Sequence, residues 1–188
     1  TLADLGLEVL GLDPSADAIP TDEFLRAADG VWAIGDVTAK LMLAHVGSAM
    51  GIVAAEAIAG QNPAPLTYQM MPRCTYSVPK VASFGYTEAA AKEAGLDFEK
   101  AVFPYRGAGK SVAVGKTEGI LKLLVDKETR EILGAHVVGA EATELIHEIL
   151  LAKTAVAALG VVIIDVGKGF VGAGMLGMIL GYLRDSTD

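Results

Sequence analysis

VWAIGDVTAKLMLAH, residues 31–45, combines a short apolar run, a Gly-Asp pair and an Ala-His pair that opens a helical pattern. The apolar run before Gly35 predicts a buried strand of an α/β sheet, and such sheets bind ligands beyond the carboxyl ends of their strands. Gly35 has no Cβ to keep a ligand from the backbone, and Asp36 offers a carboxylate to hydroxyl groups. The amides of Ala44 and His45 open a helix and favour partial negative charge. This combination suits an extended polyol, whereas AIGD alone fits a strand followed by an Asp-initiated turn equally well.

Four stretches carry a wider pattern, and the first two of them overlap residues 31–45. They are residues 19–37 (IPTDEFLRAADGVWAIGDV), 42–60 (MLAHVGSAMGIVAAEAIAG), 72–95 (PRCTYSVPKVASFGYTEAAAKEAG) and 119–148 (GILKLLVDKETREILGAHVVGAEATELIHE). In this order they resemble the pyridine nucleotide-disulfide oxidoreductases, most closely the branch that contains the dihydrolipoamide dehydrogenases. Each stretch is modest by itself, but four in the family's order are specific.

The resemblance implies a site for FAD at the Gly-Asp corner. It implies that Asp36 holds the ribityl chain of FAD, with Gly35 giving close backbone approach. It also implies that the next segment passes along the flavin ring and its pyrimidine edge. That segment consists of Met42, Leu43, Ala44 and His45.

The patterns along the chain indicate an α+β fold, an antiparallel β-meander covered by helices, preceded by the C-terminal piece of an α/β FAD-binding domain. Two prolines within residues 61–65 form the natural boundary. We therefore assign residues 1–65 to the FAD-binding part, 66–158 to a dimerisation domain and 159–188 to a divergent glycine-rich apolar tail.

Local patterns give the individual elements. Helical spacing is expected in residues 2–10, in 45–59, in 87–94 with Thr87 as the N-cap, and in 141–153. Strands are expected in residues 73–76, 80–86, 100–105, 111–115, 119–126 and 131–138, with a hairpin turn at 126–130.

Composition excludes several classes of protein. The 188 residues carry a formal charge of −8, and their basic residues are scattered, which argues against a nucleic-acid surface. Cys74 is the only cysteine, so the chain forms no internal disulfide and no thiolate metal cluster, and we expect no metal site. The chain opens without the basic start of a secretory signal. Because its first residue is Thr1, we expect sequence upstream, and we expect a cytoplasmic protein with no membrane segment.

For the complete enzyme, the resemblance implies electron transfer from a substrate dithiol through a protein disulfide and FAD to NAD. It also implies a homodimer, components of a 2-oxo acid dehydrogenase complex as partners, and a part in cell redox homeostasis. After Ala155, however, the chain departs from the family and lacks the expected His-Pro-Thr segment with its glutamate. The redox cysteine pair and the unit that binds the FAD pyrophosphate are expected upstream. We therefore predict no catalytic residues and an inactive isolated chain; the alternative is a non-catalytic dimerisation module without cofactor.

The tail has a pattern of its own, GVVIIDVGKGFVGAGMLGMILGYL in residues 160–183. Its G-x-G-x-x-G fits a dinucleotide fingerprint, but the acidic end of a second strand about twenty residues on is absent. The segment could be foreign sequence, a packed structural helix or a remnant nucleotide-binding unit. Its uninterrupted apolar run is shorter than a membrane span requires.

Other reactive residues have ordinary structural explanations. We expect His136 to be a structural or surface residue of a strand, His147 to lie on a helix surface and Cys74 to be a small buried hydrophobe. Neighbouring helix positions point apart, so His147 and Glu148 do not form an acid/base pair. Three lysines, Lys110, Lys116 and Lys122, are expected to be solvated.

Overall fold

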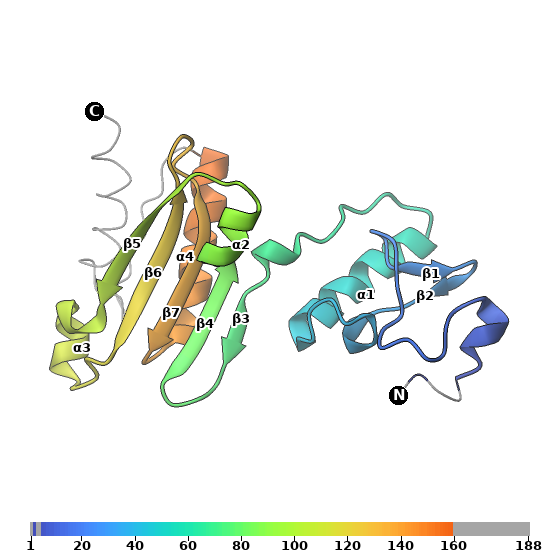
Figure 1. Ribbon diagram of the computed structural model, residues 1–188, viewed down its shortest axis with the longest axis horizontal. Coiled ribbons are helices and arrows are strands. Elements are labelled where there is room, and N and C mark those ends of the chain that lie inside the picture. Colours follow the sequence, from blue (N-terminus) through green and yellow to red (C-terminus); the bar gives the residue numbers. More distant parts are fainter. Residues whose placement is uncertain (1, 3–4, 160–188) are drawn as a thin grey trace. The chain divides into compact units, whose positions relative to one another are not determined.

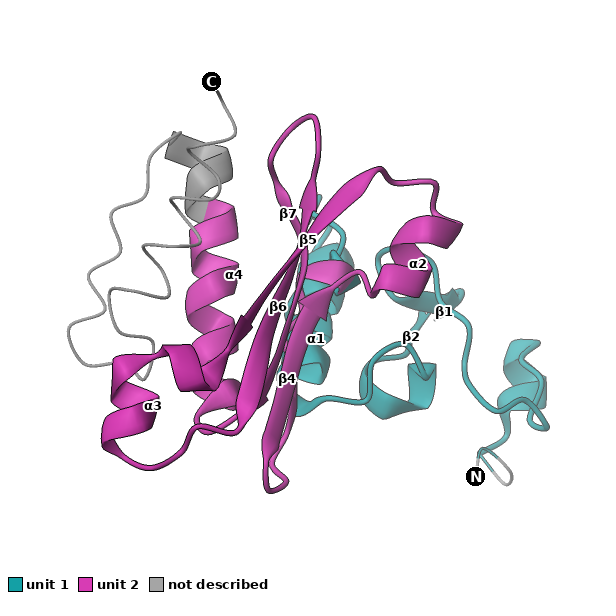
Figure 2. Ribbon diagram, turned by 60° about the vertical axis from the view of Figure 1, so that its left-hand side comes forward, with its two compact units in different colours: residues 1–68 teal, residues 69–188 magenta. Residues whose placement is uncertain are grey.

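The computed structural model describes Leu2 and residues 5–159, and it divides the chain into two compact units, residues 1–68 and 69–188 (Figures 1 and 2). Each unit has a hydrophobic cluster of its own. The predicted tail, residues 159–188, lies outside the described residues except for its first position.

Unit 1 consists of short elements and one long helix. In chain order these are η1 (Leu7–Leu10), β1 (Arg26–Ala28), β2 (Val31–Trp32), η2 (Gly35–Thr38) and α1 (Ala44–Ile58). A further turn, η3 (Tyr68–Met70), follows at the boundary between the units. Leu7, Ile19 and Ala33 form the small core of this unit.

Two expectations for unit 1 are wrong. The run before Gly35 is not a buried strand: β2 has two half-buried residues and pairs antiparallel with β1, and Ile34 is exposed. Within the described residues its sheet has two strands, β1 and β2, so the run has a single strand neighbour rather than a place inside a wide sheet. The helix expected in residues 2–10 is a single 3-10 turn, because Gly6 and Gly11 take left-handed conformations at either end of it.

Helix α1 confirms the predicted pattern. It buries Val46, Met50, Val53 and Ala54, which recur at the three- and four-residue spacing of one helix face. Gly60 follows its end with a positive φ of 74°.

Unit 2 is built on a five-stranded antiparallel sheet with the strand order β3-β4-β7-β6-β5 (Figure 1). The strands are β3 (Arg73–Thr75), β4 (Lys80–Gly85), β5 (Phe98–Pro104), β6 (Gly119–Asp126) and β7 (Ile132–Gly139). β5, β6 and β7 form a meander, and β4 pairs with the other side of β7. The expected turn between β6 and β7 is present, where Asp126 Oδ1 accepts hydrogen bonds from the backbone N–H groups of Glu128 and Thr129.

Helix α4 (Ala142–Leu159) covers one face of this sheet. Because side chains alternate along a strand, every second residue of the central strands reaches this helix. The shared core contains Ala82, Phe84, Leu121, Leu123, Val125, Ala135, Val137, Leu145, Ile146 and Ile149. We call this side of the sheet the inner face.

Two short helices complete unit 2. Figure 2 shows α2 (Glu88–Glu93) on the opposite side of the sheet from α4, which we call the outer face. Its predicted N-cap is confirmed, because Thr87 Oγ1 accepts a hydrogen bond from the N–H of Ala90 at 3.2 Å. The strand expected in residues 111–115 is instead part of the helix α3 (Gly109–Ala113), in which Val112 N–H bonds to Ala108 C=O. The alternating valines that suggested a strand, Val112 and Val114, are exposed, whereas Ser111 is buried.

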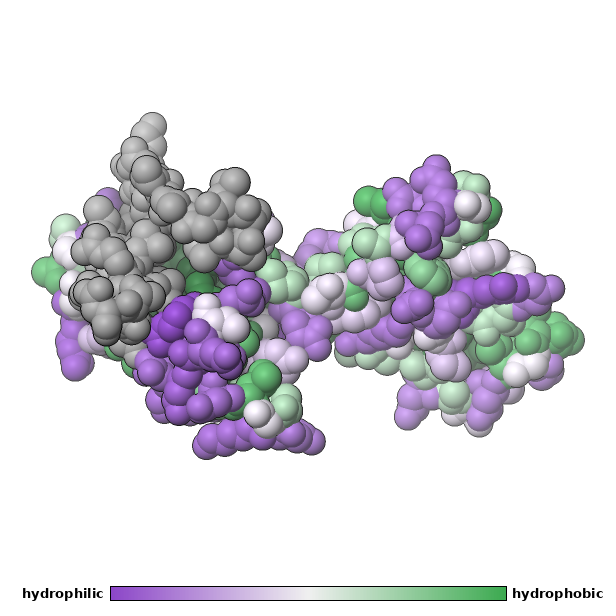
Figure 3. Space-filling model, turned by 90° about the horizontal axis from the view of Figure 1, so that it is seen from above, coloured by the Kyte–Doolittle hydropathy of each residue, from purple (hydrophilic) through white to green (hydrophobic). Residues whose placement is uncertain are grey.

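Polar and apolar side chains share the surface that one view displays. Hydrophilic side chains, in purple, cover much of the described face in Figure 3, with separate hydrophobic patches in green. Among the described helices, none is both long enough and apolar enough to span a membrane. The described residues also contain no group of three or more potential metal ligands.

The packing of α4 leads to a first prediction. Ile146 is fully buried against the inner face, so Ile146→Ala should lower the free energy of unfolding by about 2–5 kcal/mol. The neighbouring His147 is exposed, and His147→Ala should change it by less than about 0.5 kcal/mol. Urea unfolding followed by circular dichroism measures both values. Equal losses in the two variants would contradict this role of the inner face.

Candidate functional site

The Gly-Asp corner is held against the start of α1. Gly35 has a φ of +73°, and its N–H points to the Sδ atom of Met50 at 3.1 Å. Thr38 Oγ1 donates a hydrogen bond to the Gly35 carbonyl at 2.8 Å. A Cβ on Gly47 would lie only 3.5 Å from Gly35 Cα, so the corner packs closely on the first turns of the helix. The corner is therefore fixed by contacts inside unit 1.

Asp36 lies on the exposed side of this corner. Its backbone carbonyl accepts a hydrogen bond from Ala39 N–H at 2.9 Å. The residue lines a hollow in unit 1 together with Val37, Leu2 and residues 14–17. Apart from Gly35 itself and its two chain neighbours, no described residue comes within 4 Å of the position that a Cβ on Gly35 would take. A ligand can therefore lie against the backbone of Gly35 beside the Asp36 side chain.

The other predicted cofactor residues lead directly into α1. Leu43 is extended and half-buried, and the helix begins at Ala44 as expected. Met42 has 69% of its surface exposed, and Ala44 and His45 are exposed as well. The first turn of a helix carries partial positive charge, which favours an electron-rich ligand edge.

Three residues that hold the corner were missed by the sequence analysis: Thr38, Gly47 and Met50. A signal for one of them exists in the sequence, because Gly47 and Gly51 lie four positions apart on one helix face. Both positions face the corner, since a Cβ on Gly51 would lie 3.6 Å from Ile34 Cδ1. The sulfur contact of Met50 depends on how the loop folds back, for which the sequence has no local pattern.

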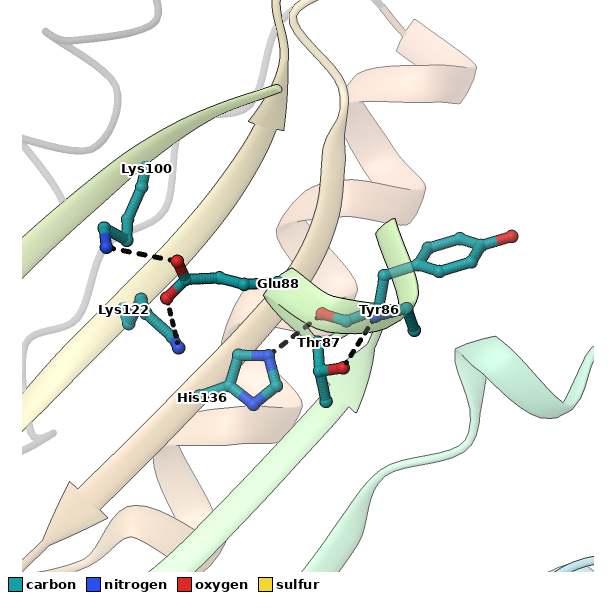
Figure 4. A network of polar contacts seen from close by, with 7 residues as sticks. Tyr86, Thr87, Glu88, Lys100, Lys122 and His136 are labelled. Carbon is teal, nitrogen blue, oxygen red and sulfur yellow. Dashed lines mark hydrogen bonds and ion pairs between the residues drawn. The ribbon is translucent and has the colours of Figure 1, made fainter. Parts of the chain in front are cut away.

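A second group of polar residues joins α2 to the outer face of the sheet (Figure 4). The Glu88 carboxylate bonds to the amines of Lys122 at 2.9 Å and of Lys100 at 3.1 Å. Hydrogen bonds from Lys122 and Lys100 lower the pKa of Glu88. We call Glu88, Lys100 and Lys122 the α2 clamp. Lys122 is thus ion-paired, which corrects the expectation that it is solvated.

His136 lies next to the α2 clamp on β7. Its Nε2–H donates to the carbonyl oxygen of Tyr86 at 3.0 Å. Burial lowers the pKa of His136, and the nearby cations Lys122 and Arg73 lower it further, against an opposing effect of the Tyr86 bond. This half-buried histidine holds the segment before α2, which confirms a structural role.

Two further side chains singled out in the sequence, His147 and Cys74, lie in separate surroundings. His147 is exposed on α4, as expected. Cys74 is half-buried, with its Sγ 3.8 Å from the Thr143 carbonyl, and burial raises the pKa of its thiol. A raised pKa disfavours the nucleophilic thiolate.

These observations define the class of unit 2, an α+β domain with one antiparallel sheet buried on one face by a long helix. Residues 71–166 match the family model described as the pyridine nucleotide-disulphide oxidoreductase, dimerisation domain. This chain therefore belongs to the pyridine nucleotide-disulphide oxidoreductase family. The match runs past Ala155, the point after which the sequence analysis expected the resemblance to end.

Curated relatives agree with this family. A dihydrolipoyl dehydrogenase of Corynebacterium glutamicum is 52% identical over 153 residues, which are 79% of this chain and 33% of that protein. A dihydrolipoyl dehydrogenase of Mycobacterium leprae is 44% identical over 151 residues, covering 79% of this chain and 32% of that protein. The chain thus spans about a third of the length of these relatives.

A solved structure supports the fold. The crystal structure of LpdA from Mycobacterium tuberculosis superposes with a TM-score of 0.83 at 22% sequence identity, covering 98% of this chain and 40% of that one. This likeness confirms the α+β architecture expected from the sequence.

The environment of His136 leads to a prediction of pH dependence. Because its pKa is lowered in the folded chain, the unfolded chain binds more protons at acid pH. The contribution of neutral His136 to the free energy of unfolding is therefore fully present above its ordinary pKa, near 6.5. It is lost as the pH falls through the lowered pKa of the folded chain.

Urea unfolding between pH 7.5 and pH 5 tests this sign. His136→Gln keeps an N–H donor for Tyr86 but does not titrate, so its stability should fall less on acidification than that of the parent. The exposed His147→Gln serves as the control and should behave like the parent. A steeper acid loss in His136→Gln would show that the sign is wrong.

Proposed function

We propose that this chain is the C-terminal part of a flavin-dependent dihydrolipoamide dehydrogenase-like oxidoreductase. Its unit 1 would contribute one side of the FAD site, and its unit 2 would join two subunits. The observation that carries the proposal is the Gly-Asp corner, where an exposed Asp36 follows Gly35, and Gly35 itself packs on the first turns of α1. In the bound state, FAD would supply the two-electron chemistry between a dithiol and NAD.

The residues present fit a ribityl chain. A carboxylate accepts hydrogen bonds only, and Asp36 would orient sugar-like hydroxyls that donate to it. Gly35 leaves space for such a chain at the backbone, and Met42 offers an exposed apolar side chain to a ring system. Ala44 and His45 would place helix-start amides near the electron-rich pyrimidine edge. These roles are assigned to the six residues that the sequence analysis selected.

The chain by itself lacks a dithiol relay. It contains one cysteine, and the half-buried Cys74 has no second thiol in the sequence with which to form a redox disulfide. We therefore infer that this chain is inactive alone. In the complete enzyme we infer electron transfer to NAD in the cytoplasm, with 2-oxo acid dehydrogenase components as partners.

A second function is a dimerisation module that binds no cofactor. It is favoured by the family match, which covers the dimerisation domain in residues 71–166. Both candidates require unit 2 to pair with a second copy. They differ in whether Asp36 has a ligand.

Light scattering after size-exclusion chromatography tests the pairing. We expect a species of twice the 19.4 kDa chain mass that is stable on dilution, because a dimerisation domain retains its contact surface. Absorbance at the flavin band should be close to zero in this species. A monomer at all concentrations would contradict the proposed role of unit 2.

Titration with FAD, followed by flavin fluorescence, separates the two functions. The first predicts weak binding that Asp36→Ala reduces about tenfold, because a hydrogen bond to a charged group contributes roughly 1.5–3 kcal/mol. Glu23→Ala removes an exposed carboxylate away from the corner and should leave the affinity unchanged. Absence of binding in the parent, or equal losses in both variants, would favour the module without cofactor.

A further inference from the structure

The outer face of the sheet in unit 2 carries an aliphatic row that crosses four strands. In the strand register, Val81 of β4 lies opposite Val138 of β7, Val138 opposite Ile120 of β6, and Ile120 opposite Pro104 of β5. Residues paired in this way point to the same face of a sheet. We call Val81, Val138, Ile120 and Pro104 the aliphatic row.

The aliphatic row is accessible. Val81 and Ile120 expose 40% and 43% of their surface, and Val138 and Pro104 are half-buried. At the β5 end, Pro104 and Ile120 line a hollow together with Val102, which is 52% exposed. Large aliphatic side chains in a continuous row are unusual on a polar surface and mark a contact site.

A basic row runs parallel to the aliphatic row. Its two cations are Arg73 of β3 and Lys122 of β6, and Ser83 of β4 and the neutral His136 of β7 lie between them in the register. Each of these residues lies two positions along its strand from the aliphatic row. The Nε of Arg73 is buried without a hydrogen-bond partner among the described residues. Arg73, Lys100 and Lys122 outnumber the single Glu88 carboxylate of the α2 clamp, which serves both lysines. At the β5 end, the hollow beside the aliphatic row is lined by one acidic and one basic residue, Glu118 and Arg106, whose charges offset each other.

The spacing of the two rows fits an α-helix laid across the strands. Neighbouring strands are about 4.8 Å apart, so the aliphatic row is about 14 Å long, the length of roughly ten helical residues. Helix side chains that recur every turn are about 5.4 Å apart, close to the strand spacing. The basic row lies about 7 Å to one side, within reach of side chains on the flank of such a helix.

The chain already uses this arrangement once. Helix α2 lies on the same face and places the Glu88 carboxylate on two lysines of the neighbouring strands (Figure 4). A second helix on the aliphatic row would repeat it, with carboxylates directed to Arg73 and to the edge of the α2 clamp.

We propose that the outer face of unit 2 is a docking site for an acidic amphipathic helix of a partner protein. The helix packs its apolar side chains on the aliphatic row and directs its carboxylates to the basic row. Charge complementarity selects this occupant, because a helix with basic flanks would place like charges beside Arg73. The proposal does not depend on FAD or on the Gly-Asp corner.

The test uses the whole chain and three labelled 18-residue peptides. The first repeats leucine every three or four residues with glutamates on the flanks, the second has lysines in place of the glutamates, and the third has serines in place of the leucines. Fluorescence anisotropy should show saturable binding of the first peptide, with at least about tenfold weaker binding of the other two.

Four variants locate the site. Ile120→Asp and Arg73→Glu alter the aliphatic and basic rows, and each should weaken binding of the first peptide about tenfold. Val112→Asp on α3 and Lys92→Glu on α2 make the same kinds of change at exposed positions away from the rows and should bind like the parent. Circular dichroism checks the fold of each variant, and Val102→Asp replaces Ile120→Asp if that chain fails to fold.

Several results would overturn the proposal. One is equal binding of the lysine peptide, and another is an equal loss in the control variants. A third is that Ile120→Asp converts a dimer of the chain into a monomer, which would show that a second copy covers the aliphatic row. Loss of FAD binding in Asp36→Ala has no bearing on any of these results, so the two proposals fail separately.

Discussion

Burial of the inner face of the sheet beneath α4 is the interaction on which unit 2 depends. Leu121, Leu123, Ala135 and Val137 alternate along β6 and β7 so that each reaches the helix, where Ile146 is fully buried among them. A shift of one residue in the register would turn this whole set outward. The register is thereby fixed, and with it the residues that the same strands present on the outer face. The α2 clamp, His136 and the aliphatic row are all consequences of this one constraint.

Close backbone contact is the second constraint, and glycine makes it possible in both units. In unit 1, Gly47 allows α1 to approach Gly35 closely, which fixes the loop that carries Asp36. In unit 2, a Cβ on Gly134 would lie 2.2 Å from the carbonyl oxygen of Tyr86, so only glycine lets this segment cross β7. The same carbonyl then accepts the His136 hydrogen bond. In both units, the absence of a side chain at a glycine allows the close backbone approach that positions neighbouring side chains.

Many polar side chains of the described residues hold the fold together. The corner of unit 1 offers a carboxylate, open backbone and a helix start, which suit the holding of a cofactor. Unit 2 belongs to a family of dimerisation domains and directs its titratable groups into structural bonds. The one thiol of the chain, Cys74, likewise lies half-buried beside the Thr143 carbonyl, with a pKa raised by burial.

Sequence periodicity by itself determined α1, the strands β6 and β7, the Thr87 cap and the exposure of His147, because these depend on residues close together in the chain. It failed in residues 111–115, where alternating valines suggested a strand but the chain turns into α3 beyond the end of β5. It also failed in residues 31–34, whose apolar character does not reveal that β1 is the neighbouring strand. Only the tertiary structure paired Lys122 with Glu88, 34 residues away, and Tyr105 with the Ala140 carbonyl, 35 residues away. Local patterns state which side chains are buried, but the topology decides which of them meet, because contacts between distant segments depend on the order and register of the strands.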